Sequence, residues 1–212
     1  MNSNIDISQL RKQLRETRRL LSAEQQQDHA LQALDHLKAF LSTTLKMQID
    51  RPLNIALFLA QDGELQTQPA IEYLWQTDQF KVYLPVLETH SDWHMAFAHY
   101  HCDSLMINNR FKIHEPSEPH KLHLNGQQLN IVLMPLVGFD SQGNRVGMGG
   151  GYYDRTFEFK RTEPKQSNQT LLIGWAHSCQ QVSVLDPQDW DVPLDGVITE
   201  KGFVSFRNEL TI

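Results

Sequence analysis

The sequence contains few of the residues and motifs that mark several protein classes. Only two of its 212 residues are cysteine, Cys102 and Cys179, and neither lies in a Cys-x-x-Cys or Cys/His ligand spacing. We interpret both as reduced, mostly buried thiols, with a catalytic role as the alternative. The ten histidines include no HExxH or similar pattern, which argues against a zinc enzyme.

Long apolar runs and excess positive charge are also missing. No apolar run approaches the ~20 residues that span a bilayer, and the N-terminus lacks the basic and apolar segments of a secretory signal. The formal net charge is −6, which argues against nucleic acid as a partner because phosphate contacts need clustered Lys and Arg. We therefore expect a cytoplasmic monomer that binds small molecules, but neither nucleic acid nor a membrane.

Helical and strand patterns alternate along the chain. Capping residues and apolar periodicity predict helices over 6–21, 22–45 and 69–77. Short apolar runs predict strands over 53–60, 81–86, 131–135, 171–175 and 196–199, and residues 91–129 are expected to be extended and partly irregular. This alternation predicts a single three-layer α/β/α domain over 1–212, with a mainly parallel sheet and with the helices of 6–45 packed on the α/β core.

Glycine is concentrated in the segment Arg145-Val-Gly-Met-Gly-Gly-Gly-Tyr-Tyr-Asp-Arg155, where four glycines lie within five positions. The segment follows a predicted strand and a turn over 139–144, and it leads into a helix predicted over 149–160. Backbone N–H groups at such a junction point toward a ligand. The segment lacks GK[ST] and departs from GxGxxG at Tyr152, so its spacing favours a phosphate-binding loop only moderately over a structural turn.

Charged side chains around these glycines fit an anionic ligand. Arg145 and Arg155 flank the loop and can hold phosphate oxygens at either end. Asp154 is placed to bind Mg²⁺ beside a phosphate, the alternative being a residue at the helix start that pairs with Arg155 or Arg11. The first helix adds a cationic stripe, which is either a nucleotide-binding surface or a solvated face: Arg11, Arg15 and Arg18.

Several short blocks occur in a characteristic order over nearly the whole chain. They are residues 11–15, 58–67, 83–86, 115–116, 134–140 and 145–155, followed by closing segments at 174–182 and 190–200. In this order and spacing the chain resembles the 5-formyltetrahydrofolate cyclo-ligase family, also called 5,10-methenyltetrahydrofolate synthetase. The resemblance implies the sugar-phosphate-isomerase and CoA-transferase-like architecture of that family.

The resemblance also implies an activity and a set of site residues. The family uses ATP and Mg²⁺ to convert 5-formyltetrahydrofolate into 5,10-methenyltetrahydrofolate, ADP and phosphate, through phosphorylation of the formyl oxygen and ring closure by N10. The positions that match its ATP site are Arg11, Lys12, Gln13, Leu14, Arg15, Arg145, Val146, Gly147, Met148, Gly149, Gly150, Gly151, Tyr152, Tyr153 and Arg155. The folate positions are Leu59, Glu64, Met95, Phe97 and Tyr152, the catalytic ones Arg145, Tyr153 and Asp154, and the Mg²⁺ ligands Asp154 and Asp191.

Alternatives remain open for some of these positions. Glu64 can instead be a solvated residue after a turn, and Met95 and Phe97 can be ordinary strand packing. Asn130 and the segment 176–178 depart from the family pattern, which leaves their local hydrogen bonding undetermined. For the whole protein, the alternatives are a non-catalytic relative that binds folate or a nucleotide and, less favoured, a small-molecule kinase.

Overall fold

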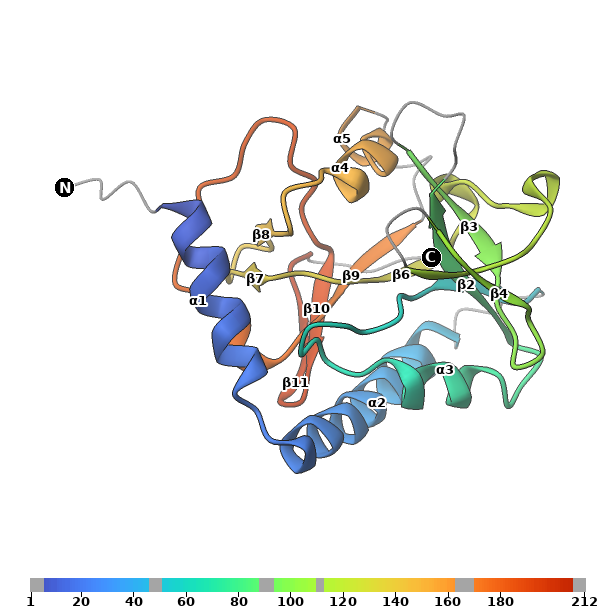
Figure 1. Cartoon of the computed structure of the whole chain (residues 1–212), viewed down its shortest axis with the longest axis horizontal. Coiled ribbons are helices and arrows are strands. Elements are labelled where there is room, and N and C mark those ends of the chain that lie inside the picture. Colours follow the sequence, from blue (N-terminus) through green and yellow to red (C-terminus); the bar gives the residue numbers. More distant parts are fainter. Residues whose placement is uncertain (1–5, 46–50, 88–93, 110–112, 163–169, 208–212) are drawn as a thin grey trace.

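The computed structural model describes residues 6–45, 51–87, 94–109, 113–162 and 170–207 and is built around a seven-stranded sheet (Figure 1). The strand order is β11-β10-β9-β6-β1-β2-β3. Its parallel part comprises β1 (Leu53–Ala56), β2 (Phe80–Leu87), β6 (Ile131–Met134), β9 (Leu171–Trp175) and β10 (Gly196–Thr199). The antiparallel edge strands are β3 (Met95–His99) and β11 (Gly202–Ser205). The predicted α/β class with a mainly parallel sheet is confirmed.

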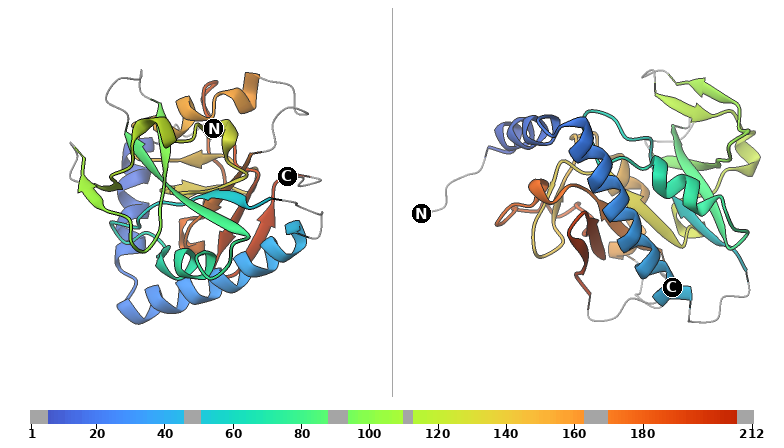
Figure 2. Two further views of the ribbon diagram at one scale, coloured as in Figure 1. Left: turned by 90° about the vertical axis from the view of Figure 1, so that its right-hand side faces the viewer. Right: turned by 90° about the horizontal axis from the view of Figure 1, so that it is seen from below.

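Helices lie on both faces of this sheet. One face is covered by α2 (Ala23–Leu45) and α3 (Gln68–Leu74), and Figure 2 shows α2 running along it. The other face carries the short helices α4 (Tyr152–Thr156) and α5 (Phe159–Thr162). Helix α1 (Ile7–Arg19) lies beside the small hairpin of β7 (Gly138–Phe139) and β8 (Arg145–Val146) in Figure 1. The remaining elements are β4 (Met106–Asn108), β5 (His114–Pro116) and the 3₁₀ helices η1 (His120–Leu122), η2 (Gly126–Gln128) and η4 (Ser178–Gln180).

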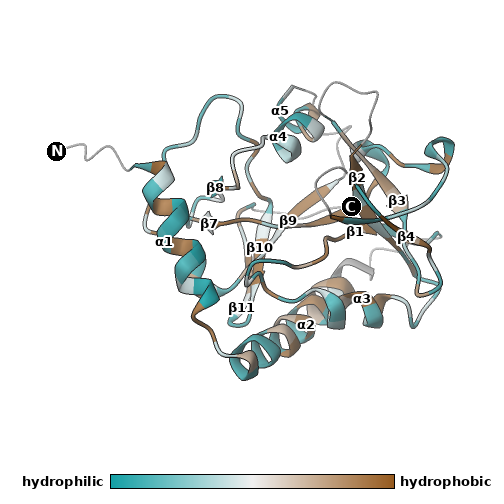
Figure 3. Cartoon of the chain, in the orientation of Figure 1, coloured by the Kyte–Doolittle hydropathy of each residue, from teal (hydrophilic) through white to brown (hydrophobic). Residues whose placement is uncertain are grey.

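Strand β6 shows how the sheet is buried on both faces. Ile131 and Leu133 pack in the cluster that contains α2 and α3, whereas Val132 and Met134 pack in the cluster of the opposite face. Successive side chains of a strand point to opposite faces, so a strand that is covered on both sides needs an unbroken apolar run. Figure 3 shows the central strands mostly brown and α1 mostly teal.

The first two helices begin where their capping residues predict. The carboxylate of Asp6 accepts hydrogen bonds from the backbone N–H groups of Ser8 and Gln9, at 2.9 and 3.3 Å. Before α2, the hydroxyl of Ser22 accepts from the Gln25 N–H and the Gln25 side chain accepts from the Ser22 N–H, at 3.1 and 2.9 Å. This reciprocal pair is the predicted capping box, and it satisfies two backbone donors that a helix leaves open.

The helix predicted over 149–160 is wrong in its extent. The chain becomes helical only at Tyr152, because Gly149 and Gly151 have φ of +92° and +65°, which no right-handed helix contains. The helical segment then breaks at Phe157 into α4 and α5. The glycine segment is therefore a loop along most of its length, and α4 has only five residues.

Other differences are smaller. The strand predicted over 53–60 ends at Ala56, where the chain leaves the sheet, and edge strand β11 was not predicted. The described parts of 91–129 are short strands and 3₁₀ turns, as expected, while 91–93 and 110–112 lie outside the described residues. Both cysteines are free, but Cys102 is exposed and Cys179 only partly buried, so the expectation of mostly buried thiols is wrong for Cys102.

The direction of the chain through the sheet reverses between β1 and β6. From β1 it proceeds to β2 and β3 on one side, and from β6 to β9 and β10 on the other. In open α/β sheets the ligand cleft forms at the carboxyl ends of the strands at such a point. Here those ends lead into residues 57–67 and 135–151. Across the described ranges, no helix has the length and apolar character needed to cross a membrane.

Candidate active site

Arg18 of α1 holds together the two segments that leave the sheet at the reversal point. Its guanidinium donates to the carbonyl of Asp62 after β1, at 2.9 Å, and to the carbonyl of Leu136 after β6, at 3.1 Å. It also contacts the Asp62 carboxylate at 3.0 Å and lies 3.6 Å from Glu64. The Arg18 side chain is only 1% exposed. A buried guanidinium with these partners fixes the distance between the two segments.

The carboxylate of Asp62 forms ion pairs with three arginines of α1. It accepts hydrogen bonds from Arg15 and Arg18, at 2.7 and 3.0 Å, and from Arg19. Burial by itself would raise the pKa of Asp62, but the hydrogen bonds from Arg15, Arg19 and Arg18 lower it to about 2. For Arg18 the interpretation of the cationic stripe as a solvated face is wrong, since that side chain is buried.

Glu64 lies in the cleft and is not solvated. Its side chain is 16% exposed, and one carboxylate oxygen accepts a hydrogen bond from the Gln61 backbone N–H at 2.9 Å. Burial raises the pKa of Glu64, although the Gln61 N–H and the Arg18 charge oppose the rise. The alternative of a solvated residue after the turn is therefore wrong. A mostly buried carboxylate at this place can accept hydrogen bonds from N–H donors of a ligand.

Asp140 organises the hairpin that delivers the glycine loop. Its side chain is fully buried, and one oxygen accepts from the N–H groups of Gln142 and Asn144, at 2.9 and 3.0 Å. The other oxygen accepts from the Asn144 amide and from the Leu185 N–H, at 2.9 and 3.0 Å. These four bonds confirm the turn predicted over 139–144. They place β8, with Arg145, directly ahead of the glycines.

The glycine loop is open on one side and held by arginines on the other. A Cβ at Gly147 would meet no atom within 4 Å, so the backbone there borders open space. Arg11 of α1 donates to the Gly147 carbonyl at 2.8 Å, and Arg155 donates to the Gly150 carbonyl at 2.6 Å. The structure thus brings together the loop and the first residue of the cationic stripe. Because α4 is so short, its dipole adds less at the loop than the predicted longer helix would.

Arg145 carries an incomplete set of hydrogen bonds in a buried position. Its side chain is 6% exposed, and one terminal nitrogen donates to an oxygen of Asp154 at 2.6 Å. Its Nε is buried and has no hydrogen-bond partner among the described residues. A buried donor without a partner costs about 1–3 kcal/mol, which an anionic ligand would recover. The residues present therefore fit a bound phosphate at this point.

One carboxylate oxygen of Asp154 carries both of its hydrogen bonds to described residues. Its two recorded hydrogen bonds, from Arg145 and from the Val192 backbone N–H at 3.2 Å, both end on Oδ1. Within the described part of the chain, this leaves Oδ2 for a metal. Asp191 precedes Val192 in the chain, and its carboxylate accepts from the Gln188 N–H at 2.9 Å. Carboxylate oxygens are suitable Mg²⁺ ligands, so the donors fit that ion. The alternative pairing of Asp154 with Arg155 or Arg11 is wrong, since its partner is Arg145.

The Tyr153 phenol lies close enough to Glu64 and Arg145 for both charges to act on its pKa. Burial of its phenol, together with the charge of Glu64, raises the pKa of Tyr153, and the nearby Arg145 opposes that rise. The phenol is therefore protonated at neutral pH and can donate a hydrogen bond. Glu64 comes from the segment after β1, whereas Tyr153 and Arg145 come from the segment after β6. These residues lie where an open α/β sheet is expected to bind its ligand, and we call the group of Glu64, Arg145, Tyr153, Asp154 and the loop 147–151 the switch-point cleft.

Other predicted ATP positions lie around the cleft in different environments. Leu14 is buried against Val137, Val146 and Leu185, so it docks α1 on the domain. Lys12 and Gln13 are exposed on α1, and Met148 is 60% exposed at the tip of the loop. Arg15, which the resemblance assigns to ATP, is held by Asp62. The Arg155 guanidinium lies over the ring of Tyr152, 5.4 Å from its centroid.

The predicted folate positions are divided between cleft and core. Phe97 is fully buried and packs on Phe157, with 6.0 Å between the ring centroids. Met95 is 7% exposed in the same cluster, and Leu59 is partly buried against the cluster of the other face. Strand packing thus describes Phe97 and Met95 well, and a contact with folate remains a prediction for both.

Sequence reasoning missed the role of Asp62, which it treated as part of a turn. The available signal was the arginine stripe on α1, because a stripe that docks on a domain needs an acidic partner.

Asn130 also has a clear place, since its side-chain oxygen accepts from the Asn54 N–H at 2.8 Å and so joins β6 to β1. Although Asn130 departs from the family pattern, its side chain therefore has a hydrogen-bond partner.

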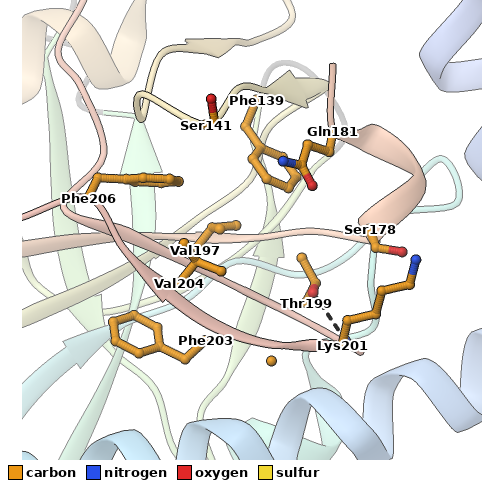
Figure 4. A pocket seen from close by; sticks show the side chains of 11 residues that line it. Phe139, Ser141, Ser178, Gln181, Val197, Thr199, Lys201, Phe203, Val204 and Phe206 are labelled. Carbon is orange, nitrogen blue, oxygen red and sulfur yellow. Dashed lines mark hydrogen bonds between the residues drawn. The ribbon is translucent and has the colours of Figure 1, made fainter. Parts of the chain in front are cut away.

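A surface pocket lies apart from the switch-point cleft, beside β10 and β11 (Figure 4). Its lining includes Phe139, Lys201 and Phe206. Among the described residues that line it, there is none of those predicted to bind ATP, folate or Mg²⁺. The charged side chains predicted for the site converge at the switch-point cleft instead.

A doubly wound sheet with charged side chains at its point of reversal is the arrangement of an α/β protein whose ligand site lies at that point. The chain belongs to the 5-formyltetrahydrofolate cyclo-ligase family, whose family model matches residues 4–200. It is 40% identical over 186 residues to the 5-formyltetrahydrofolate cyclo-ligase of Escherichia coli strain K12, covering 88% of this chain and 96% of that protein. It is 36% identical over 197 residues to the cyclo-ligase of Haemophilus influenzae, covering 90% and 95%.

Solved structures of relatives share the fold. The NMR structure of the Aquifex aeolicus 5,10-methenyltetrahydrofolate synthetase superposes with a TM-score of 0.76 at 25% identity, over 97% of this chain and 95% of that one. The corresponding synthetase of Mycoplasma pneumoniae gives a TM-score of 0.68 at 27% identity, over 92% and 99%. The resemblance noted in the sequence is thus confirmed at the level of family and fold.

Proposed function

We propose that this protein is a 5-formyltetrahydrofolate cyclo-ligase, an ATP-dependent enzyme of folate one-carbon metabolism. Membership of the family over residues 4–200 carries the proposal. The switch-point cleft supports it. Arg145 has a buried donor without a partner among the described residues, Asp154 has a carboxylate oxygen without a hydrogen bond among them, and Glu64 is a buried acceptor.

The reaction makes specific demands on the protein. The formyl oxygen of 5-formyltetrahydrofolate is a poor leaving group until it receives the γ-phosphate of ATP. N10 then attacks the formyl carbon, and phosphate departs with the former formyl oxygen, which leaves 5,10-methenyltetrahydrofolate, ADP and phosphate. No covalent bond to the enzyme is needed. Catalysis therefore depends on alignment of the reactants and on neutralisation of phosphate charge.

The arginines and the glycine loop supply the nucleotide side of the site. The unpartnered Nε of Arg145 would donate to a phosphate oxygen, while its terminal nitrogen stays on Asp154. Backbone at Gly147 borders open space through which a phosphate can approach closely. Arg11, held on the Gly147 carbonyl, adds positive charge beside the loop. Asp154, with Asp191 as the second ligand, would hold Mg²⁺, which would supply further positive charge at the phosphates.

We infer that the folate lies between Glu64 and the two tyrosines of α4. The Glu64 carboxylate would accept hydrogen bonds from the N–H edge of the pterin ring, and its desolvated position supports this role. Tyr153, protonated in the cleft, would donate to the substrate near the reacting oxygen, and Tyr152 offers a ring for stacking. Leu59, Met95 and Phe97 would support the ring from the core.

We also infer that residues 1–212 form one domain and that the protein acts as a cytoplasmic monomer. The first helices support the single domain, because α1 and α2 bury their apolar residues in clusters shared with the sheet and the β7–β8 hairpin. The free thiols of Cys102 and Cys179 agree with a reducing compartment.

An absorbance assay of the methenyl product tests the proposed function. With 5-formyltetrahydrofolate, ATP and Mg²⁺, we expect the methenyl chromophore to appear and to require ATP. Folate binding without turnover would favour the non-catalytic relative. A stable phosphorylated folate would favour the kinase, so either result contradicts the proposal.

A further inference from the structure

Two histidines and a glutamate that could ligate a metal ion form a cluster outside the residues of the switch-point cleft. His29 belongs to α2, His177 follows β9 and Glu200 follows β10. The Nδ1 atoms of the two histidines are 2.9 Å apart, and a Glu200 oxygen lies 3.9 Å from Nδ1 of His29. One ligand atom from each residue falls within a group no wider than 4.8 Å. His177 and Glu200 are buried, whereas the His29 side chain is 21% exposed.

The hydrogen bonds of Gln26 determine which nitrogen of His177 is free to bind. The Gln26 amide nitrogen donates to the carbonyls of Arg18 and Gly63, at 3.2 and 3.3 Å, so the amide oxygen must face His177. That oxygen lies 3.1 Å from Nε2 of His177 and can only accept, so Nε2 carries the proton. In the neutral ring the lone pair is then on Nδ1, where it accepts a hydrogen bond from Nδ1 of His29. A metal ion would replace that proton and bind the tautomer of His29 that carries its proton on Nε2.

We propose that His29, His177 and Glu200 form a binding site for a divalent transition metal of the zinc class. Both histidines would bind through Nδ1 and Glu200 through a carboxylate oxygen, with water in the remaining position. Two imidazoles and one carboxylate suit Zn²⁺, whereas Mg²⁺ prefers oxygen ligands alone. Tetrahedral Zn²⁺ with bonds of about 2.0–2.1 Å needs the two nitrogens about 3.3 Å apart, so the rings would separate slightly.

The surroundings of the cluster resemble those of a built metal site. Gln26 fixes the tautomer of His177, which is what outer partners of metal-binding histidines do. Glu200 is oriented by Ser178, whose backbone N–H donates to one oxygen at 2.9 Å and whose hydroxyl donates to the other. The partly exposed His29 gives an ion a path from solvent. The chain separation of 148 residues between His29 and His177 explains why no spacing motif indicated this site.

A bound ion would connect three parts of the fold. It would tie α2 to the ends of β9 and β10, and through Gln26 it would stiffen the Asp62–Gly63 turn that borders the switch-point cleft. Since the ligands come from distant parts of the chain, the ion binds the folded state and raises its stability. The site therefore links the availability of zinc to the stability of the enzyme.

Titration of the metal-free full chain with Zn²⁺, and with Co²⁺ for its visible spectrum, tests the proposal. We expect one tight equivalent in the wild type, with a higher melting temperature and no competition from millimolar Mg²⁺. His29→Ala should weaken that equivalent at least tenfold, and Gln26→Ala about 10–100-fold. His36→Ala removes another histidine of α2 outside the cluster and should change nothing.

Three outcomes would overturn the proposal. The first is the absence of a tight Zn²⁺ equivalent in the wild type. The second is a tight equivalent that survives His29→Ala with unchanged affinity. The third is loss of the equivalent on His101→Ala, which would place the ion at the exposed cluster of His101, Cys102 and Asp103 instead. Far-UV circular dichroism of each variant confirms that the fold is retained, and His29, being partly exposed, is the ligand best suited to substitution.

Discussion

Arg145→Ala should lower kcat for ATP-dependent methenyl formation by about 10²- to 10³-fold, the range for loss of one transition-state donor. Arg145 is almost fully buried, and its Nε has no hydrogen-bond partner among the described residues. Under the proposed function, its interaction with the transferring phosphate would be strongest as charge redistributes in the transition state. The effect should therefore fall mainly on kcat, which initial rates at saturating ATP and folate measure.

Two matched variants separate charge from geometry. Arg145→Lys keeps the positive charge but loses the planar fork that serves Asp154 and a phosphate together, so an intermediate rate is expected. Arg161→Ala removes an exposed arginine of α5 and should leave the rate unchanged. Circular dichroism and the melting temperature check that Arg145→Ala stays folded. Near-normal turnover by a folded Arg145→Ala variant would show that the assignment is wrong.

Asp154→Asn should also reduce kcat by at least about 10²-fold, for a different reason. The amide oxygen can still accept hydrogen bonds from Arg145 and from the Val192 N–H, although the buried charge of Arg145 loses its counter-ion, so the melting temperature of the variant is measured alongside its rate. An amide nevertheless binds Mg²⁺ more weakly than a carboxylate does, because it carries no charge. The variant should need a higher Mg²⁺ concentration for half-maximal rate, which a Mg²⁺ titration at fixed ATP measures.

The shape of that titration distinguishes two roles of Asp154. If the carboxylate only positions Arg145, the Asn variant would show a raised KM for ATP and the Mg²⁺ dependence of the wild type. That result would contradict its assignment as a metal ligand. Asp189→Ala, an exposed aspartate in the same segment as Asp191, is the control and should behave like the wild type.

The elements of the sheet could be predicted from the sequence because their signal is local. The unbroken apolar run 131–134 can be buried only between two layers, and Ser22 with Gln25 specifies a helix start through its own side chains. The helix over 149–160 failed for an equally local reason. Glycine tolerates both helical and left-handed conformations, so the sequence alone could not show that Gly149 and Gly151 adopt the latter.

The cleft was only partly predictable because its contacts are distant in the chain. Helical periodicity placed Arg11, Arg15 and Arg18 on one side of α1, but it cannot distinguish a solvated face from one that meets an acidic partner. That partner, Asp62, is 44 residues from Arg18. The pairing of Arg145 with Asp154 likewise depends on the hairpin that Asp140 builds, which sequence patterns indicate as a turn without giving its geometry.

A substrate labelled with ¹⁸O at the formyl oxygen tests the central claim most directly. If the cleft activates that oxygen by phosphorylation, the label must leave with the phosphate when N10 closes the ring. We predict one ¹⁸O-labelled inorganic phosphate for each methenyl product formed, in a reaction that requires ATP. Methenyl formation with unlabelled phosphate, or with the label in water, would contradict the account.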